Sequence, residues 1–280
     1  MFVPSFVLAA MLIAFGSGVL GAMLGLGGGI ILVPLLIFFL NVPIQVAAGA
    51  SIVAVVATSS VAAIAYVRNE ITNMRLGMFL ELATTFGAIT GAFITSFTSE
   101  RILSILLGLS MIYAAAVMFM QSKQTNRSFT EVKNDTIAKK LSLGGSYYDS
   151  VRKEEVEYGV THTPQTFVIS YIAGILSGLL GIGGGGIKVP TMNVVAGIPM
   201  KVAAATSNFM IGVTAAASAL VYIRNGYCDA FLTAPVVLGT LLGAFVGTRL
   251  MNRVRGKDLK KIFILVLVIL GVRMIWSGLI

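Results

Sequence analysis

The stretch Gly25-Leu26-Gly27-Gly28-Gly29-Ile30-Ile31-Leu32-Val33-Pro34 returns 156 positions later as Gly181-Ile182-Gly183-Gly184-Gly185-Gly186-Ile187-Lys188-Val189-Pro190. The correspondence continues without a gap for about seventy residues and also pairs Ser51 with Ser207 and Thr58 with Thr214. A match of this length at a fixed offset indicates an internal duplication. The chain therefore consists of two copies of one unit, and each copy carries its own glycine run.

Composition places both copies in a membrane. The chain is 57% hydrophobic and only 11% charged, whereas soluble domains have about a quarter of their residues charged. Apolar segments cover 5–24, 30–40, 46–67, 76–97, 102–121, 166–182, 187–196, 202–223, 230–250 and 259–280. A helix needs about 20 residues to cross the hydrocarbon core, and only the two segments after the glycine runs, 30–40 and 187–196, are clearly too short. We predict an all-α integral membrane protein in which each repeat has about three full spanning helices plus a glycine-broken short helix pair.

The positions of the charges predict the orientation of the chain. Five segments in each half are an odd number, so the second repeat is expected to be inverted relative to the first. If every segment crosses, one side of the membrane receives sixteen of the twenty Lys and Arg residues, and the positive-inside rule makes that side cytoplasmic. We therefore expect residues 1–121 as the first membrane repeat, 122–165 as a polar cytoplasmic linker and 166–280 as the second repeat. We therefore expect a multi-pass protein of the cell membrane with both termini outside the cell.

The glycine runs predict an anion site. Glycine lets the backbone approach a ligand, and the unpaired N–H groups at the start of the following helix favour negative charge. Irregular backbone at membrane depth is tolerated where it is buried in protein or lines a watery cavity. The candidate ligands are the amides of Gly27, Gly28, Gly29, Ile30, Gly183, Gly184, Gly185 and Gly186. The alternative is close helix packing, which the four-residue spacing of Gly87/Gly91 and Gly239/Gly243/Gly247 indicates for those glycines.

Several polar residues near the runs complete the candidate site. Lys188 stands where the first copy has Leu32; it either faces a cavity, where it adds positive charge, or extends to an interface. Hydroxyls and an amide on the following long helices either bind an oxyanion or join helices: Ser51, Thr58, Ser207, Asn208 and Thr214. Glu81, the one acidic residue inside an apolar segment, is either a carboxylate that reaches the interface or a proton-coupling group.

The sequence argues against catalysis. With a single cysteine, Cys228, and a single histidine, His162, the chain offers no disulfide framework and no Cys/His metal cluster. No nucleophile with an adjacent base is evident, so we predict no catalytic residue, no metal and no cofactor. The expected partners are a small anionic substrate and the lipid bilayer. Nucleic acid is not among them, since the net charge of +9 is explained by membrane orientation; a homo-oligomer stays open.

The doubled signature also resembles a known family. The stretches at 24–34 and 180–190, together with Val-Ala-Ala-Ala-Thr-Ser-Asn at 202–208 and Val-Leu-Gly-Thr-Leu-Leu-Gly-Ala at 237–244, resemble the sulfite exporter TauE/SafE family of membrane permeases. The resemblance implies a permease for small sulfur-containing oxyanions such as sulfite or organosulfonates, and we expect export by alternating access. The alternatives are an anion channel and a proton-coupled uptake permease for another small organic anion. Gly186 against Ile30 and Lys188 against Leu32 indicate that the two copies are not equivalent.

Overall fold

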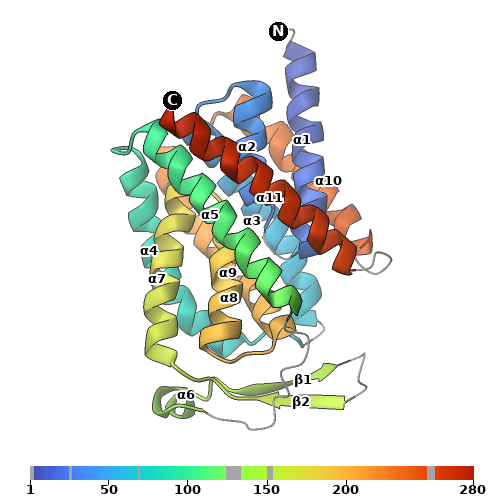
Figure 1. Cartoon of the computed structure of the whole chain (residues 1–280), viewed down its shortest axis with the longest axis vertical. Helices are drawn as coiled ribbons and strands as arrows, with labels where there is room; N and C mark the ends of the chain where they lie inside the picture. Colours follow the sequence, from blue (N-terminus) through green and yellow to red (C-terminus); the bar gives the residue numbers. More distant parts are fainter. Residues whose placement is uncertain (1–2, 25–26, 69, 124–133, 150–153, 251–255) are drawn as a thin grey trace.

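The computed structural model describes residues 3–24, 27–68, 70–123, 134–149, 154–250 and 256–280. Long helices form a bundle, and a small unit with two strands covers one end of it (Figure 1). The first helix begins and the last helix ends at the opposite end of the bundle. The two chain ends therefore lie on the side away from the strands.

The elements follow the duplicated order. The first half contains α1 (Val3–Leu24), α2 (Gly29–Leu40), α3 (Ile44–Arg68), α4 (Met74–Thr95) and α5 (Glu100–Lys123). The second half contains α7 (Thr163–Leu180), α8 (Gly185–Pro190), the π-helix η1 (Thr191–Val195), α9 (Met200–Arg224), α10 (Ala230–Leu250) and α11 (Gly256–Leu279). Among the described helices, seven (α1, α3, α4, α5, α7, α9 and α10) are long and apolar enough to cross a membrane. The chain is a multi-pass membrane protein.

Helices of one half pack closely against helices of the other half. Glycines of α10 lie against backbone carbonyls of α1 in the order Gly239 on Met11, Gly243 on Phe15 and Gly247 on Val19. Likewise, Gly87 and Gly91 of α4 lie against the carbonyls of Tyr171 and Ile175 in α7. The residue numbers rise together in both pairs, so α1 runs parallel to α10 and α4 runs parallel to α7. The prediction that these glycines serve close packing is confirmed.

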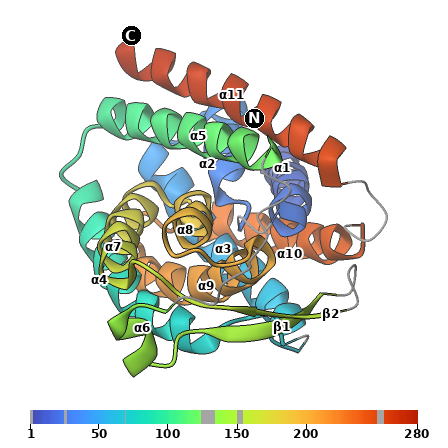
Figure 2. The same cartoon turned by 60° about the horizontal axis from the view of Figure 1, so that its bottom comes forward.

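The equivalent helices of the two halves run in opposite directions. Gly108 of α5 faces the carbonyl of Gly271 in α11, and Gly278 of α11 faces the carbonyl of Arg101 in α5. These two helices lie side by side (Figures 1 and 2). On α3 and α9, Gly49 faces Tyr227 beyond the end of α9, while Ser59 faces Gly212. Rising numbers on one helix meet falling numbers on the other, so α5 and α11 are antiparallel, as are α3 and α9.

Each glycine run forms the tip of a helical hairpin. The N–H of Thr161, just before α7, donates to the carbonyl of Ala196, just after η1, over 3.0 Å. The chain therefore enters the bundle along α7, turns at the glycines and returns to the same end. In the first half, α2 has 12 residues and rises only about 18 Å. It returns toward the end of the bundle where α1 begins (Figure 1).

The second short helix is interrupted where Pro190 stands. Helix α8 ends at this residue and the chain continues as η1. Pro190 has no N–H to donate to the carbonyl four residues earlier, so one hydrogen bond of the α-helical ladder is missing there. The first copy keeps Pro34 inside a continuous helix. The two short helices therefore differ in form although their sequences correspond.

The linker carries structure that the sequence did not predict. Helix α6 (Thr136–Lys140) precedes the antiparallel strands β1 (Gly145–Asp149) and β2 (Glu154–Tyr158), which pair Gly145 with Tyr158. Asp135 caps α6 and accepts hydrogen bonds from the N–H groups of Ala138 (2.7 Å) and of Thr163 (2.6 Å) in α7. Burial alone would raise the pKa of the Asp135 carboxyl, but these hydrogen bonds hold its pKa below the ordinary value.

Asn73 joins this linker unit to the bundle. Its side chain caps α4 and donates to the carbonyl of Leu143 (2.7 Å) and to the hydroxyl of Tyr158 (3.0 Å). Its backbone N–H donates to Thr206 Oγ1 of α9 over 3.0 Å. One residue therefore connects the linker unit, α4 and α9. Contact between the linker unit and the bundle is extended by a shared apolar cluster that includes Leu76.

Candidate functional site

The glycine turns have a backbone that other residues rarely adopt. Gly27 and Gly28 have φ of 74° and 75°, and Gly183 and Gly184 have φ of 75° and 72°. This left-handed region carries almost no penalty for glycine and is strained for residues with a Cβ. Helices α2 and α8 begin at the next residue of each run. The first N–H groups of both helices have no acceptor within their own helix and point toward the turns.

The two turns meet at the centre of the bundle. A Cβ added at Gly183 would lie 2.9 Å from Val55 Cγ1 and 3.0 Å from Ile211 Cγ2. A Cβ at Gly27 would meet the same two side chains at 3.4 Å and 3.3 Å. Val55 of α3 and Ile211 of α9 hold equivalent positions in the two copies. Both glycine tips therefore rest on one pair of apolar residues contributed by both halves.

The predicted hydroxyl ligands divide into two groups. Ser51 donates to the carbonyl of Gly181 over 2.8 Å, and Thr58 donates to the carbonyl of Gly27 over 3.1 Å. These two hydroxyls stabilise the turns. Within the described part of the chain, the hydroxyl of Ser207 is buried and has no hydrogen-bond partner. It is the hydroxyl of this set left to bind something else; the Asn208 amide donates to Ala204 of its own helix (3.1 Å).

The strongest polar feature is a buried chain of three side chains. Lys188 Nζ donates to Thr214 Oγ1 over 2.7 Å, and Thr214 Oγ1 donates to Glu81 Oε1 over 2.7 Å. The exposed fractions are 1% for Lys188, 0% for Thr214 and 7% for Glu81. Thr84 and Thr85, on the same helix as Glu81, donate to its carboxylate over 2.9 Å and 2.8 Å. A cation and a carboxylate from different halves thus share a hydroxyl inside the bundle.

The structure corrects two interpretations. Glu81 does not reach the interface but is buried, and its carboxylate accepts hydrogen bonds from three hydroxyls. Lys188 does not extend to an interface; it is enclosed, and its Nζ donates to Thr214. Thr84 and Thr85 were not singled out in the sequence. Their spacing of three and four residues after Glu81 on one helix was the available signal.

The place that the duplication relates to this network is apolar. At the same offset of 156 positions, Lys188 corresponds to Leu32 and Glu81 corresponds to Val237. Leu32 is buried in the large apolar cluster, and Val237 packs against that cluster. The charged pair, with one residue from each half, is therefore replaced by an apolar pair at the place related to it by the duplication. The site lacks the symmetry of the fold.

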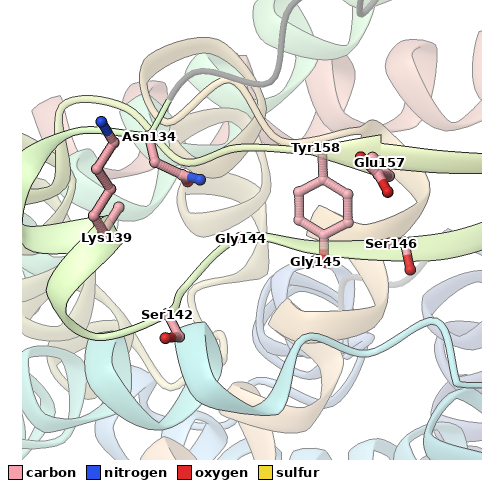
Figure 3. Close-up of a pocket in the computed structure, with 9 residues that line it drawn as sticks. Asn134, Lys139, Ser142, Gly144, Gly145, Ser146, Glu157 and Tyr158 are labelled. Atoms are coloured by element: carbon pink, nitrogen blue, oxygen red, sulfur yellow. The ribbon is translucent and has the colours of Figure 1, made fainter.

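Cavities among the described residues lie in the linker unit, at the start of α7 and beside the second glycine run. A cavity of about 490 Å³ lies in the linker unit, where Tyr158, Lys139 and Asn134 are among its lining residues (Figure 3). A second, of about 480 Å³, lies near the start of α7 and is lined in part by His162. The third, of about 280 Å³, is mostly apolar and touches Ile187, next to the second glycine run. The described glycines of the turns themselves are buried, apart from the half-buried Gly186.

A multi-pass bundle with a buried cation, a buried carboxylate and two glycine-tipped hairpins has the architecture of a membrane transporter. Comparison with known protein families supports this class of protein. Residues 10–274 match the family model described as sulfite exporter TauE/SafE. The chain belongs to this family of membrane transporters.

Individual relatives cover nearly the whole chain. The probable membrane transporter protein YunE of Bacillus subtilis (strain 168) is 27% identical over 269 residues, which is 94% of this chain and 94% of the relative. YdhB of the same organism, also named a probable membrane transporter protein, is 23% identical over 95% of this chain and 98% of its own. A probable membrane transporter protein of Xylella fastidiosa (strain 9a5c) is 25% identical over 95% and 92%. No solved structure matches the chain at a significant level.

Proposed function

We propose that this transporter exports small sulfur-containing oxyanions, such as sulfite or organosulfonates, across the cell membrane by alternating access. The observation that carries the proposal is the buried Lys188, one helical turn beyond the second glycine tip. A lysine enclosed in a membrane bundle is costly and marks a path or site for charge. The family description supplies the substrate class.

The proposed substrate site combines backbone and side chains of both halves. The amides at the starts of α2 and α8 supply partial positive charge, Lys188 supplies a full charge, and the free hydroxyl of Ser207 supplies a further donor. The packing of the glycine tips against Val55 and Ile211 then corresponds to a closed state between inward-facing and outward-facing forms. Opening separates the tips and admits the anion.

We further propose that the two halves are inverted repeats. The antiparallel directions of α5 and α11 and of α3 and α9, which are equivalent positions, support this topology. We also propose that the linker unit lies in the cytoplasm, because the alternation of segments in the sequence assigns most Lys and Arg residues to the same side as the linker. Both chain termini then face outside.

The membrane potential favours export. An interior potential of about −100 mV gives a monoanion about 2.3 kcal/mol on leaving the cell, which corresponds to a gradient of roughly fortyfold to fiftyfold. Export therefore needs no coupling ion. Proton-coupled uptake of an organic anion is the second candidate, and the buried carboxylate of Glu81 is the observation in its favour.

Flux measurements on the purified protein in liposomes test these proposals. Sulfite, sulfate, thiosulfate and a sulfonate are compared under imposed voltage and under an imposed pH gradient. Export predicts saturable flux of a sulfur oxyanion that follows voltage and shows counterflow. Flux that requires the pH gradient favours proton-coupled uptake, and single-channel currents indicate a channel. If none of the four anions moves, the export proposal is refuted.

A further inference from the structure

We propose that Glu81 is a built-in substitute for the substrate: in the empty transporter its carboxylate neutralises Lys188 through Thr214, and the transported anion takes its place. This inference rests on the proposed function, because it assigns a step to the same site. The carboxylate and the ammonium group are joined by two hydrogen bonds of 2.7 Å, with the Thr214 hydroxyl between them. Glu81 comes from α4 in the first half, whereas Lys188 and Thr214 come from α8 and α9 in the second.

The hydrogen bonding of Lys188 is compatible with this exchange of partners. A lysine ammonium group has three N–H donors. Of the described residues, only the Thr214 hydroxyl is hydrogen-bonded to it. Two of its donors therefore remain for an oxyanion that reaches the site when the glycine tips separate. Lys188 lies one turn along α8 from Gly184, whose carbonyl accepts from the Lys188 N–H over 3.1 Å.

Thr214 is built to change partners. Its hydroxyl lies 2.7 Å from the Glu81 carboxylate and 2.9 Å from the carbonyl of Met210, one turn earlier on its own helix. When the anion displaces the link to Glu81, the hydroxyl turns to Met210 and keeps an acceptor. Glu81 in turn keeps the hydrogen bonds from Thr84 and Thr85. No buried donor loses its partner in the exchange.

The charge balance explains why a carboxylate is needed. With Glu81 present, the empty closed site has one positive and one negative group and is neutral. Without it, the empty transporter must close around an uncompensated lysine, which is costly in a membrane interior. The loaded transporter without Glu81 is spared this cost, because the anion itself neutralises Lys188; in the loaded wild type, the displaced carboxylate keeps the hydrogen bonds from Thr84 and Thr85. Glu81 is therefore required for the return of the empty transporter and dispensable while the site is loaded.

The related apolar pair, Leu32 and Val237, indicates that packing does not require the charged network. At the equivalent place Leu32 and Val237 belong to a continuous apolar cluster. Helices α2 and α10 are held there without any ion pair. The charges of Lys188 and Glu81 are thus an addition to a framework that packs without them.

The test separates net efflux from exchange. Wild type and Glu81→Gln are placed in liposomes loaded with radiolabelled sulfite, with the membrane potential clamped at zero. Net efflux into sulfite-free buffer requires the empty transporter to return, whereas exchange against external sulfite does not. We expect Glu81→Gln to lose net efflux by at least about tenfold, while exchange stays within about twofold of wild type. Glu100→Gln, which removes an exposed carboxylate from α5, is the matched control and should change neither rate.

Two further measurements guard against a folding defect. The purified variant should elute as a single species, and sulfite should raise its unfolding temperature more than that of wild type, because the competing carboxylate is gone. Equal loss of efflux and exchange, or loss of neither, overturns the counter-ion role while leaving the proposed function standing. If wild type moves none of sulfite, sulfate, thiosulfate and the sulfonate, the proposed function itself is refuted.

Discussion

Replacing Lys188 and Glu81 by the residues that the duplication pairs with them should reveal the coupling free energy between the two charges. The changes are Lys188→Leu and Glu81→Val, made singly and together, which transfers the Leu32/Val237 pair to the second site. Both charged side chains are buried, at 1% and 7% exposed. Each single change therefore leaves an unpaired charge inside the bundle.

The magnitudes follow from burial. Removing one member of a buried charge pair costs about 3–5 kcal/mol, because the remaining charge is uncompensated. Replacing the whole pair with apolar residues is neutral or stabilises by about 1–4 kcal/mol. The coupling free energy between the two changes should therefore exceed about 3 kcal/mol, far above the value of about 0.5 kcal/mol within which independent sites add.

Thermal unfolding in detergent measures this cycle. If about 1 kcal/mol shifts the midpoint by about 2–4 °C, each single variant should unfold roughly 6–20 °C below wild type. The double variant should unfold at or above the wild-type temperature and should carry no sulfite flux. Additive effects of the two changes would refute the reasoning, since they would mean that the charges do not share one network. So would a double variant less stable than either single variant.

The remaining predictions concern the glycine tips, the two serines and the linker. Gly28→Ala should destabilise the protein by about 1–2 kcal/mol in thermal unfolding, because φ is 75° there, whereas Gly186→Ala, whose φ is not positive, should cost less. Ser51→Ala should cost about 1 kcal/mol by removing its hydrogen bond, whereas Ser207→Ala should leave stability unchanged and raise the KM for sulfite. The lowered pKa of Asp135 means that its contribution is complete above pH 3.8 and is lost as pH falls through the lower folded-state value. Asp135→Asn should abolish this loss, as followed by proteolysis of the linker unit, and equal acid sensitivity in the variant would contradict the assignment.

Much of the architecture was readable from the sequence. Hydropathy and the repeat predicted a helical membrane protein with glycine-broken segments, and these segments are the hairpin tips. The candidate residues Lys188, Thr214 and Glu81 were each identified from their residue type and place. Their union in one network was not predicted, because it depends on α4 of one half packing beside α9 of the other. The spacing within one helix carries no information about which distant helix lies next to it.

The structure of the linker could not be predicted from the sequence. Its polar composition predicted a solvated connector, yet α6 and the two strands pack against the bundle through Tyr158 and Leu143. Asn73 supplies the attachment from a loop about seventy residues earlier in the chain. Short strands without a regular apolar alternation leave little signal in a sequence. Contacts with the bundle, rather than local preference, stabilise them.

The packing of helices of one half against helices of the other also affects how the chain folds during synthesis. In the complete protein α1 packs on α10 and α4 packs on α7. When only the first half has been synthesised, α1 and α4 therefore lack the helices against which they pack. We therefore expect that neither half folds independently and that expression of the first 121 residues alone yields a fragment cleared by membrane proteases. Coexpression of two fragments divided within the linker should restore the assembled protein.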